Sequence, residues 1–355
     1  MAANRAELLR LLEKMGVPIG SAFLEAVAKI TSRAQIMRLT LAIEAGNIEA
    51  AFQAAGMRVG SWGTLTESIR NAYITGGAFV MARDVPKRFG AEFNISNPRA
   101  EQWLRQHSSQ LITLINADQR DSVQILMRAG LQAGRNPKSI GLDIVGRIGA
   151  NGRRSGGVLG LNGPQTQYLA DFRQALSGPL PVGVHRIGPD GNPVKKFWIG
   201  NDGELQSVYS RRDKRFDGTV RKAIANETPL DTATVNRLTG RYSDRLLKLR
   251  GDTIGRTEAL SALNESSDEA LRQIVQEGLA PPDAVTRIWR HSFSQNERPG
   301  HLQMSGQERG INEPFLNPLT GVSLQHPGEG PASETINCRC MIEHKIDFIK
   351  AEMAA

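Results

Sequence analysis

The sequence has little cysteine and few aromatic residues, and it lacks any long apolar run. Two of its 355 residues are cysteine, and aromatic side chains make up 5% of the chain. Two cysteines without a secretory signal argue against a disulfide framework. No segment approaches the roughly 18 apolar residues that are needed to cross a bilayer. We therefore expect a protein without membrane contacts, made and kept in the cytosol or in a particle assembled there.

The sequence also lacks a complete nucleotide-binding motif. Residues 149–163 are rich in glycine and superficially resemble a phosphate-binding loop. However, this stretch has no Gly-Lys-Ser/Thr ending, and it does not follow the strand–glycine–helix pattern of a dinucleotide-binding fold. The pattern is more typical of a flexible surface loop.

Positive charge is in excess. The chain has 44 lysines and arginines against 36 acidic residues, which gives a net charge of +8. Such a balance favours contact with nucleic acid through phosphate neutralisation, although a merely soluble basic protein would show it too.

Apolar periodicity predicts that residues 1–150 form a helical region. Three short helices are expected before residue 56, with the first ending at Gly16, and a break is expected at Gly76-Gly77. Asn97 and Asn136 each precede a proline, a pattern that starts helices because asparagine caps and proline fits the first turn.

Residues 151–230 change character. A glycine-rich connector leads to a helix that begins at Pro164, and two or three β-prone segments at 182–212 predict a β-hairpin arm. The arm and its exit are the most basic part of the chain, which predicts non-specific phosphate contacts, with a solvated charged face as the alternative. The predicted DNA-binding residues are Lys195, Lys196, Arg211, Arg212, Lys214 and Arg215.

Residues 231–345 read as a small α+β domain, and 346–355 as a tail. We expect a helix at 231–264 with a bend at Gly251, a second helix opened by a capping box at Ser266 and ended near Gly278, and a strand at 285–290. A short helix is expected from Ile342 to Met353. The predicted fold class is mainly α with a β-hairpin arm and a small α+β C-terminal domain.

The C-terminal third contains short motifs in a fixed order. It opens with Arg256-Thr257-Glu258 on a helix, followed by Trp289 on a strand. The remaining members are Arg298, His301, Gly306, Phe315, His326, Pro327, Glu334, Asn337, Cys338, Arg339 and Cys340. This ordered set resembles the C-terminal domain of the phage head morphogenesis family, the Mu F-like minor head proteins, over about residues 235–345.

The resemblance implies a minor head protein of a tailed bacteriophage. Such a protein is made in the bacterial host cytoplasm and ends in the virion, inside the head or at the portal vertex. The implied partners are portal, capsid or scaffold proteins and packaged double-stranded DNA. Two features depart from the family: the β-hairpin arm looks like an insertion, and Ser294 stands where the family often has an acid.

The closing Asn337-Cys338-Arg339-Cys340 has two interpretations. Cysteines one residue apart make a poor disulfide with each other. Together with His344, and with His301 or His326, they would supply the nitrogen and sulfur ligands that zinc requires. Alternatively, one thiol is buried while Asn337 and Arg339 hydrogen-bond to fix the terminal loop. We expect no cofactor, with zinc as the open alternative; the chain would then be a zinc-stabilised nucleic-acid-binding module.

An enzymatic interpretation is also open. His301 with Arg298 and Glu334 would form an acid–base set of the kind used by nuclease- or transferase-type toxins. A lone histidine in a polar loop is more often structural, so we do not expect catalysis. Glu258 is expected in an ion pair on the helix surface or between helices, or as a support for the histidine and cysteine loops.

Overall fold

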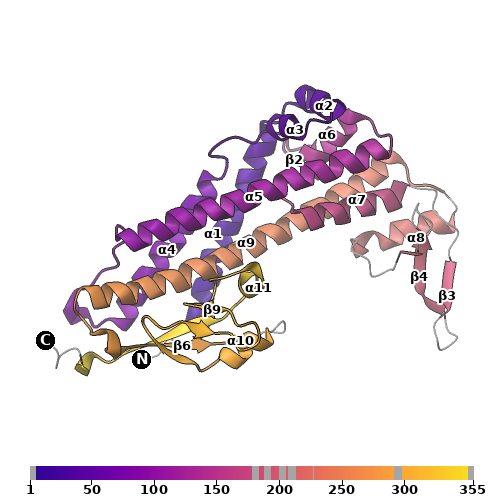
Figure 1. Cartoon of the computed structure of the whole chain (residues 1–355). Coiled ribbons are helices and arrows are strands. Elements are labelled where there is room, and N and C mark those ends of the chain that lie inside the picture. The colour runs from indigo at the N-terminus through magenta and orange to yellow at the C-terminus, as the bar shows by residue number, and fades with distance from the viewer. Residues whose placement is uncertain are drawn as a thin grey trace. The chain divides into compact units, whose positions relative to one another are not determined.

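The protein is mainly α-helical, as the sequence predicts (Figure 1). The computed structural model describes residues 5–177, 184–187, 193–199, 205–206, 213–226, 228–291 and 298–350. No helix in these ranges is long and apolar enough to span a membrane. The helices are α1 (Arg5–Ser32), α2 (Ile36–Glu44), α3 (Ile48–Ala54), α4 (Gly63–Asp84), α5 (Pro98–Gln132), α6 (Pro137–Val145), α7 (Gly163–Ser177), α8 (Asp217–Ala225), α9 (Thr232–Gln276), α10 (Pro299–Met304) and α11 (Ala332–Thr335).

The strands form small antiparallel sheets. The predicted arm is a three-stranded sheet in the order β3-β4-β5, and the C-terminal region holds a sheet in the order β10-β6-β7 and a pair β8-β9. The strands are β1 (Arg147–Ile148), β2 (Arg154–Ser155), β3 (Val184–Ile187), β4 (Pro193–Ile199), β5 (Leu205–Gln206), β6 (Val285–Arg290), β7 (Glu308–Gly310), β8 (Phe315–Leu316), β9 (Ser323–Leu324) and β10 (Met341–Ile346).

The chain divides into two compact units, and each is assembled from segments distant in the sequence. The first unit comprises residues 1–23, 62–111 and 251–355, and the second comprises residues 24–61 and 112–250. Helices α1, α5 and α9 contribute to both units. The small C-terminal sheets therefore belong to the same unit as α4 and the start of α1.

Glycines inside the long helices serve close packing, and the sequence interpretation mistook Gly16 for a helix end. Helix α1 continues through Gly16 and Gly20 to Ser32. A Cβ atom at Gly20 would lie 2.8 Å from the carbonyl oxygen of Gly251 on α9, and one at Gly255 would lie 2.3 Å from that of Gly16. Only glycine permits the two backbones to approach so closely. The glycines are therefore explained by close packing of α1 against α9, and they do not end the helix.

The predicted breaks in α4 and α9 are likewise wrong. Helix α4 runs through Gly77, whose missing side chain leaves room for the ring of Phe93. Helix α9 is a single helix of 45 residues, and Ser266 does not cap a new one. Its hydroxyl instead donates to the carbonyl of Leu263 inside the helix, where Ser266 is fully buried. A buried serine inside a helix finds a hydrogen-bond partner for its hydroxyl in this way. The sequence pattern alone does not distinguish such a serine from one that caps a helix.

The helix starts predicted from asparagine and proline are confirmed. The side chain of Asn97 accepts a hydrogen bond from the backbone N–H of Arg99, and that of Asn136 accepts one from Lys138. Helices α5 and α6 begin at the prolines that follow. These local bonds satisfy N–H groups that have no partner within the helix.

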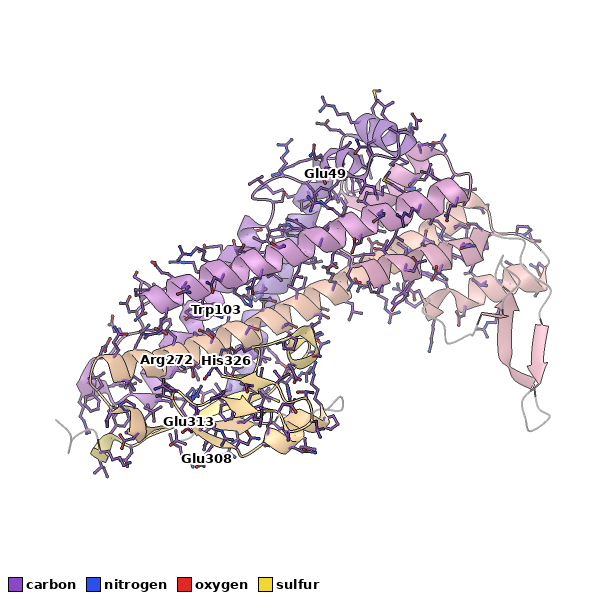
Figure 2. All side chains as sticks on the ribbon, in the orientation of Figure 1. Glu49, Trp103, Arg272, Glu308, Glu313 and His326 are labelled. Atoms are coloured by element: carbon purple, nitrogen blue, oxygen red, sulfur yellow. The ribbon has the colours of Figure 1, made fainter. Side chains whose placement is uncertain are left out.

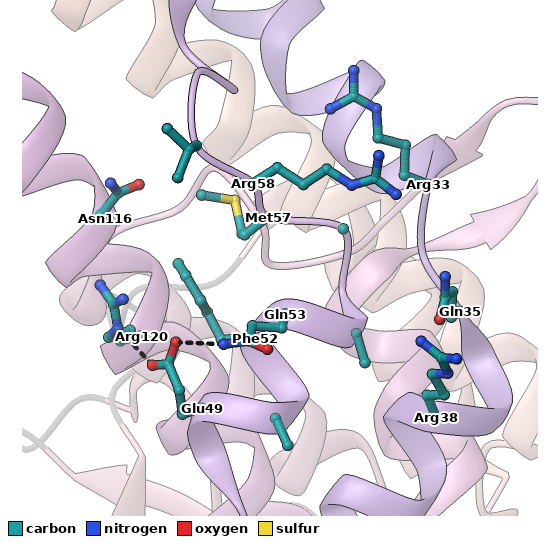
Figure 3. A pocket seen from close by; sticks show the side chains of 14 residues that line it. Arg33, Gln35, Arg38, Glu49, Phe52, Gln53, Met57, Arg58, Asn116 and Arg120 are labelled. Carbon is teal, nitrogen blue, oxygen red and sulfur yellow. Dashed lines mark hydrogen bonds and ion pairs between the residues drawn. The ribbon is translucent and has the colours of Figure 1, made fainter.

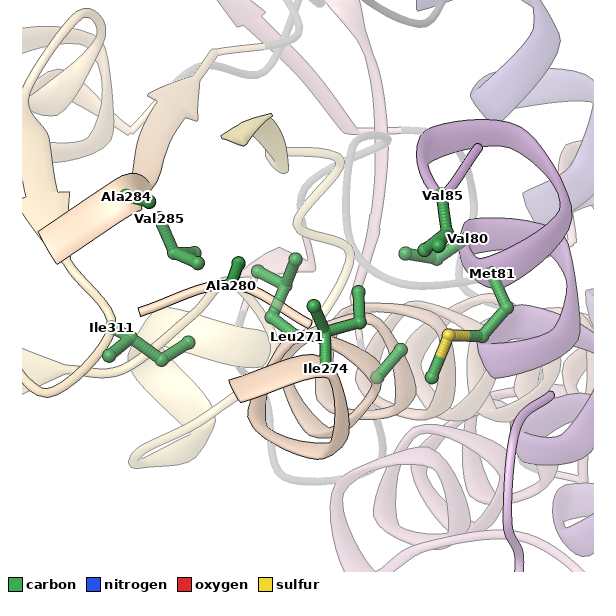
Figure 4. Close-up of a cluster of buried hydrophobic side chains, with 10 residues drawn as sticks. Val80, Met81, Val85, Leu271, Ile274, Ala280, Ala284, Val285 and Ile311 are labelled. Carbon is green, nitrogen blue, oxygen red and sulfur yellow. The ribbon is translucent and has the colours of Figure 1, made fainter. Parts of the chain in front are cut away.

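The C-terminal sheet is anchored to the helices by an aliphatic core. Figure 4 shows Leu271 and Ile274 of α9 between Met81 of α4 and Val285 of β6. The expected strand at 285–290 is confirmed as β6, but the expected helix from Ile342 is wrong, because residues 341–346 pair with β6 along its whole length. Pairing with a strand far away in the sequence overrode the local helical pattern.

Candidate metal centre

Two short helices and a turn bring the C-terminal motif residues together. Helix α10 follows directly after Arg298 and carries His301, and α11 carries Glu334. The guanidinium of Arg298 donates to the backbone carbonyls of Ser333 at 2.5 Å and Ile336 at 2.6 Å. Arg298 therefore ties the start of α10 to α11, and it has a structural role here.

The imidazole of His301 is held in one orientation by a carboxylate. Its Nε2 lies 2.6 Å from Oε2 of Glu334. Oε2 also accepts from the side chain of Asn317 at 3.1 Å, and Oε1 accepts from the hydroxyl of Thr320 at 2.9 Å. Burial raises the pKa of Glu334, but these hydrogen bonds outweigh it and hold the pKa below its usual value. The ionised Glu334 places a proton on Nε2, and Nδ1 therefore faces the other side of the ring.

Both thiols lie on that other side. The Sγ of Cys338 is 3.4 Å from Nδ1 of His301, and the Sγ of Cys340 is 3.7 Å from it. A tight turn makes this possible: Asn337 has a φ of +57°, and the backbone N–H of Cys340 donates to the Sγ of Cys338. Because β10 starts only at Met341, the two cysteines do not alternate as they would in a strand.

His301, Cys338 and Cys340 form what we call the His–Cys–Cys group. The three ligand atoms lie within 4.8 Å of one another, and all three residues are buried. The hydrogen bond from the Cys340 thiol and the adjacent His301 lower the pKa of Cys338 to about 5, against the opposing effect of burial. Burial lowers the pKa of His301, but Cys338 and Glu334 raise it above its usual value.

The donor set of this group suits a metal ion such as zinc. Zinc binds imidazole nitrogen and thiolate sulfur, and a metal-bound histidine typically donates its other N–H to a carboxylate. Glu334 stands in that position. Both cysteines are free thiols, so neither is consumed in a disulfide. Among the described residues the group supplies three ligands.

Two histidines proposed as further ligands lie elsewhere. His344 is on β10, and its Nδ1 is 3.5 Å from the carboxylate of Asp84. His326 binds Glu265 through Nε2 at 2.6 Å and faces the carbonyl of Pro327 through Nδ1 at 3.0 Å. The inclusion of His344 in the ligand set is thus corrected: pairing of β10 with β6 carries it away from the turn that holds the cysteines.

An aromatic ring packs against the His–Cys–Cys group, and a second ring packs behind the first. Trp289 of β6 meets His301 edge to face with the ring centres 5.3 Å apart, and it meets Phe315 at 5.4 Å. Trp289 is fully buried. Gly306 has a φ of +91° and donates its N–H to the carbonyl of Trp289, so that the chain can turn behind the ring. Trp289 thus forms an apolar side of the centre, and Phe315 and Gly306 hold it in place.

The motif on α9 contacts the cysteine turn. The guanidinium of Arg256 donates to the side chain of Asn337 at 3.4 Å, and the N–H of Asn337 donates to the hydroxyl of Thr257 at 3.4 Å. Of the alternatives for Glu258, the structure shows the pair between helices, because its carboxylate meets Nε2 of His107 on α5. The Arg256-Thr257 pair thus supports the loop, while Arg339 is exposed.

The burial of His301 and its neighbours limits the access of a substrate to the imidazole. His301 and Glu334 are 1% and 3% exposed, and Arg298 is occupied by backbone carbonyls. A substrate would have to reach an imidazole that is enclosed on all these sides. Ser294, the departure from the family pattern, lies outside the described residues.

The predicted DNA-binding residues are only partly described. Lys195 and Lys196 lie on β4, and Arg211 and Arg212 fall outside the described residues. Lys214 and Arg215 form a short turn before α8. Arg215 is engaged within the protein, since its guanidinium pairs with the buried Asp213 at 2.5 Å.

The sequence interpretation missed Arg287, the most heavily bonded side chain near the centre. It lies in the middle of β6, is fully buried, and donates to Asp268 on α9 at 2.7 Å. Arg272, which is labelled in Figure 2, pairs with the same Asp268. Arg287 also donates to the carbonyls of Gly310, Glu313 and Gln325. Strand alternation places Arg287 on the face of Val285 and Trp289 and Arg290 on the opposite face, but the residue type gave no sign that an arginine would be buried there.

Comparison of the chain with protein-family models, with curated proteins and with solved structures finds no match.

Proposed function

We propose that this chain is a minor head protein of a tailed bacteriophage that acts in head morphogenesis. The observation that supports the proposal is the convergence of the motif residues that carry the resemblance. Trp289, His301, Glu334 and Cys338 form one buried cluster, and Arg256 reaches the turn beside it. These residues span some eighty positions of the sequence, and their meeting in one place supports the view that the ordered motifs belong together.

The role implied is structural. The protein would enter the assembling head, contact the portal, capsid or scaffold proteins, and touch packaged double-stranded DNA through non-specific phosphate contacts. Its net charge of +8 favours the last of these. The burial of His301 favours an assembly role over a nuclease or transferase that would use this histidine.

The test is to locate the chain in particles. Particles from a culture that carries the gene are purified, treated with nuclease and analysed by quantitative mass spectrometry. We expect a fixed ratio of this chain to the portal protein, and fewer DNA-filled heads when the gene is deleted. If the chain stays in the soluble fraction while infective particles form normally without it, the proposal is wrong.

We also propose that the His–Cys–Cys group binds one zinc ion, which stabilises the C-terminal part of the chain. Nδ1 of His301 and the two thiol sulfurs surround a common point, and Glu334 fixes the imidazole from behind. Zinc bound there would join α10 to the cysteine turn. Because soft sulfur ligands favour zinc over magnesium or calcium, the donor set selects the metal class.

Metal analysis of the purified protein tests the site. We expect one zinc per chain, and its loss in Cys338→Ser and Cys340→Ser. Replacement by cobalt should give a thiolate-to-metal charge-transfer band in the near ultraviolet. Glu334→Gln should weaken the affinity by roughly 10- to 100-fold, because it disturbs the orientation of the ligating histidine.

The matched control is His344→Gln, which removes a buried histidine that is not part of the group. This variant should keep its zinc. A wild-type protein without stoichiometric metal after purification in zinc-supplemented medium would refute the site. Retention of the metal by Cys338→Ser and Cys340→Ser would refute it equally.

A further inference from the structure

The second unit contains a pocket whose lining is dominated by arginine. The pocket has a volume of about 670 Å³ and lies among the end of α1, the start of α2, α3 with the loop after it, and the middle of α5 (Figure 3). Its charged side chains are Arg33, Arg38, Arg58, Arg120 and Glu49. The lining therefore contains four arginines and one acidic residue.

The backbone that shapes the pocket is fixed by close contacts. The N–H of Gln35 donates to the carbonyl of Ala54 at 2.8 Å, which joins the turn after α1 to the end of α3. Gly56 has a φ of +103°, and a Cβ atom there would lie 2.1 Å from the carbonyl oxygen of Ile30. The loop that carries Arg58 is thus pressed against the end of α1, beside Arg33. Figure 3 shows the Arg58 side chain reaching toward Arg33.

The single acid of the pocket is already used. Glu49 pairs with Arg120 at 3.0 Å, and this hydrogen bond holds the pKa of Glu49 below its usual value. Arg120 also lies over the ring of Phe52, 4.3 Å from the ring centre. In the part of the chain that the structure describes, the guanidinium groups of Arg33, Arg38 and Arg58 have no hydrogen-bonding or ionic partner.

Three unpaired guanidinium groups around one concavity repel one another and produce a strongly positive local potential. Such an arrangement is stabilised when an anion enters. Arginine suits phosphate in particular, because its planar fork can donate two parallel hydrogen bonds to phosphate oxygens. Gln35 also lines the pocket, whereas the amide of Gln53 already donates to Glu49 at 3.3 Å.

We propose that this pocket binds phosphate groups, supplied either by the backbone of a nucleic acid or by a free polyphosphate. This inference does not depend on the zinc site or on the motifs of the C-terminal region, which belong to the other unit. It also places a phosphate contact away from the basic arm, where the sequence had indicated one. Arg33 and Arg58 are the main contacts, and Arg38 supports them from α2.

The experiment compares Arg33→Gln/Arg58→Gln with the control Arg128→Gln. Arg128 is exposed on α5, outside the pocket, and like the other two it has no described partner. Binding of a fluorescein-labelled DNA duplex is measured by anisotropy over a series of salt concentrations. Each lost phosphate contact lowers the slope of log K against log salt by about 1, so the double variant should lose about 2.

Inorganic tripolyphosphate, measured by titration calorimetry, separates the two sources. Dependence of duplex binding on Arg33 and Arg58 identifies nucleic acid as the source. Dependence of tripolyphosphate binding alone identifies a small polyphosphate. If the double variant binds both probes as the Arg128→Gln control does, the proposal is overturned.

The variants change exposed or half-buried side chains and should fold, which circular dichroism checks. The outcome is independent of the head-assembly test. Absence of the chain from particles would leave the binding data intact, and a failed binding test would leave the particle data intact.

Discussion

Replacement of Arg287 by methionine should open the C-terminal region that carries the candidate metal centre. The side chain of Arg287 is 0% exposed and ends in bonds to Asp268 and to the carbonyls of Gly310, Glu313 and Gln325. It therefore links β6 to α9, to the end of β7 and to two loops. Methionine would fill much of the volume but would donate to none of these acceptors, of which Asp268 keeps Arg272 and the carbonyl of Gly310 keeps the N–H of Glu313.

The magnitude follows from the bonds that are lost. Removal of one partner of a buried ion pair costs about 3–5 kcal/mol, and a buried acceptor left unpaired costs about 1–3 kcal/mol. Asp268 keeps Arg272, which lies 2.8 Å away, and this reduces the first cost. We expect a loss of about 4 kcal/mol, a large share of the roughly 5–15 kcal/mol that stabilises a typical domain.

The two cysteines provide a local assay, because both are buried and the chain has no others. In metal-free protein, the rate at which they react with a thiol reagent reports how often this region opens. Since about 1.4 kcal/mol corresponds to a factor of ten, Arg287→Met should accelerate the reaction by roughly a thousandfold. Arg290→Met is the control, because Arg290 lies on the same strand but is exposed. Equal reaction rates in the two variants would refute this account of Arg287.

Three further predictions concern other buried groups. Burial lowers the pKa of His326, but Glu265 outweighs burial and raises the pKa from 6.5 to about 9. About 3 kcal/mol of stability should therefore be present below pH 6.5 and be lost as the pH rises through 9. Urea unfolding at a series of pH values should show this loss, and the variant His326→Gln should not. Gly255→Val should destabilise by about 3 kcal/mol through a clash with α1, whereas Gly218→Ala, in open space, should be nearly neutral in thermal unfolding. Asp143→Asn should cost about 3–5 kcal/mol of stability, since this buried acid pairs with Arg135, Arg147 and Arg173. The control is Asp121→Asn, at an exposed site, and equal melting temperatures of the two variants would contradict this account.

Much of the fold could be predicted because local signals were strong. Asparagine–proline pairs marked the starts of α5 and α6, and alternating residues marked β6. The failures share one cause. Gly16, Gly77 and Ser266 carry typical signals of a helix end or start, yet each lies inside a helix and meets a neighbouring segment. Local patterns cannot record which distant backbone will lie against a residue.

The candidate site was predicted in part. The sequence put His301, Cys338 and Cys340 in one ligand set, and the structure brings them within 4.8 Å. It also drew attention to Glu334, but as a catalytic partner, whereas here it orients the imidazole. His344 was grouped with the cysteines only because it follows them closely in sequence. Strand pairing decided otherwise.

The sequence by itself determined the helical character, the basic charge and the short list of residues able to bind metal, because composition and local spacing encode these directly. Tertiary structure decided which of those residues meet. Nδ1 of His301 faces two thiols because Arg298 docks α10 on α11 and because Asn337 turns the chain. The arginine pocket depends equally on folding, since Arg33, Arg58 and Arg120 come from segments with no common motif. Contacts between distant segments depend on packing as a whole, and no single stretch of sequence specifies them.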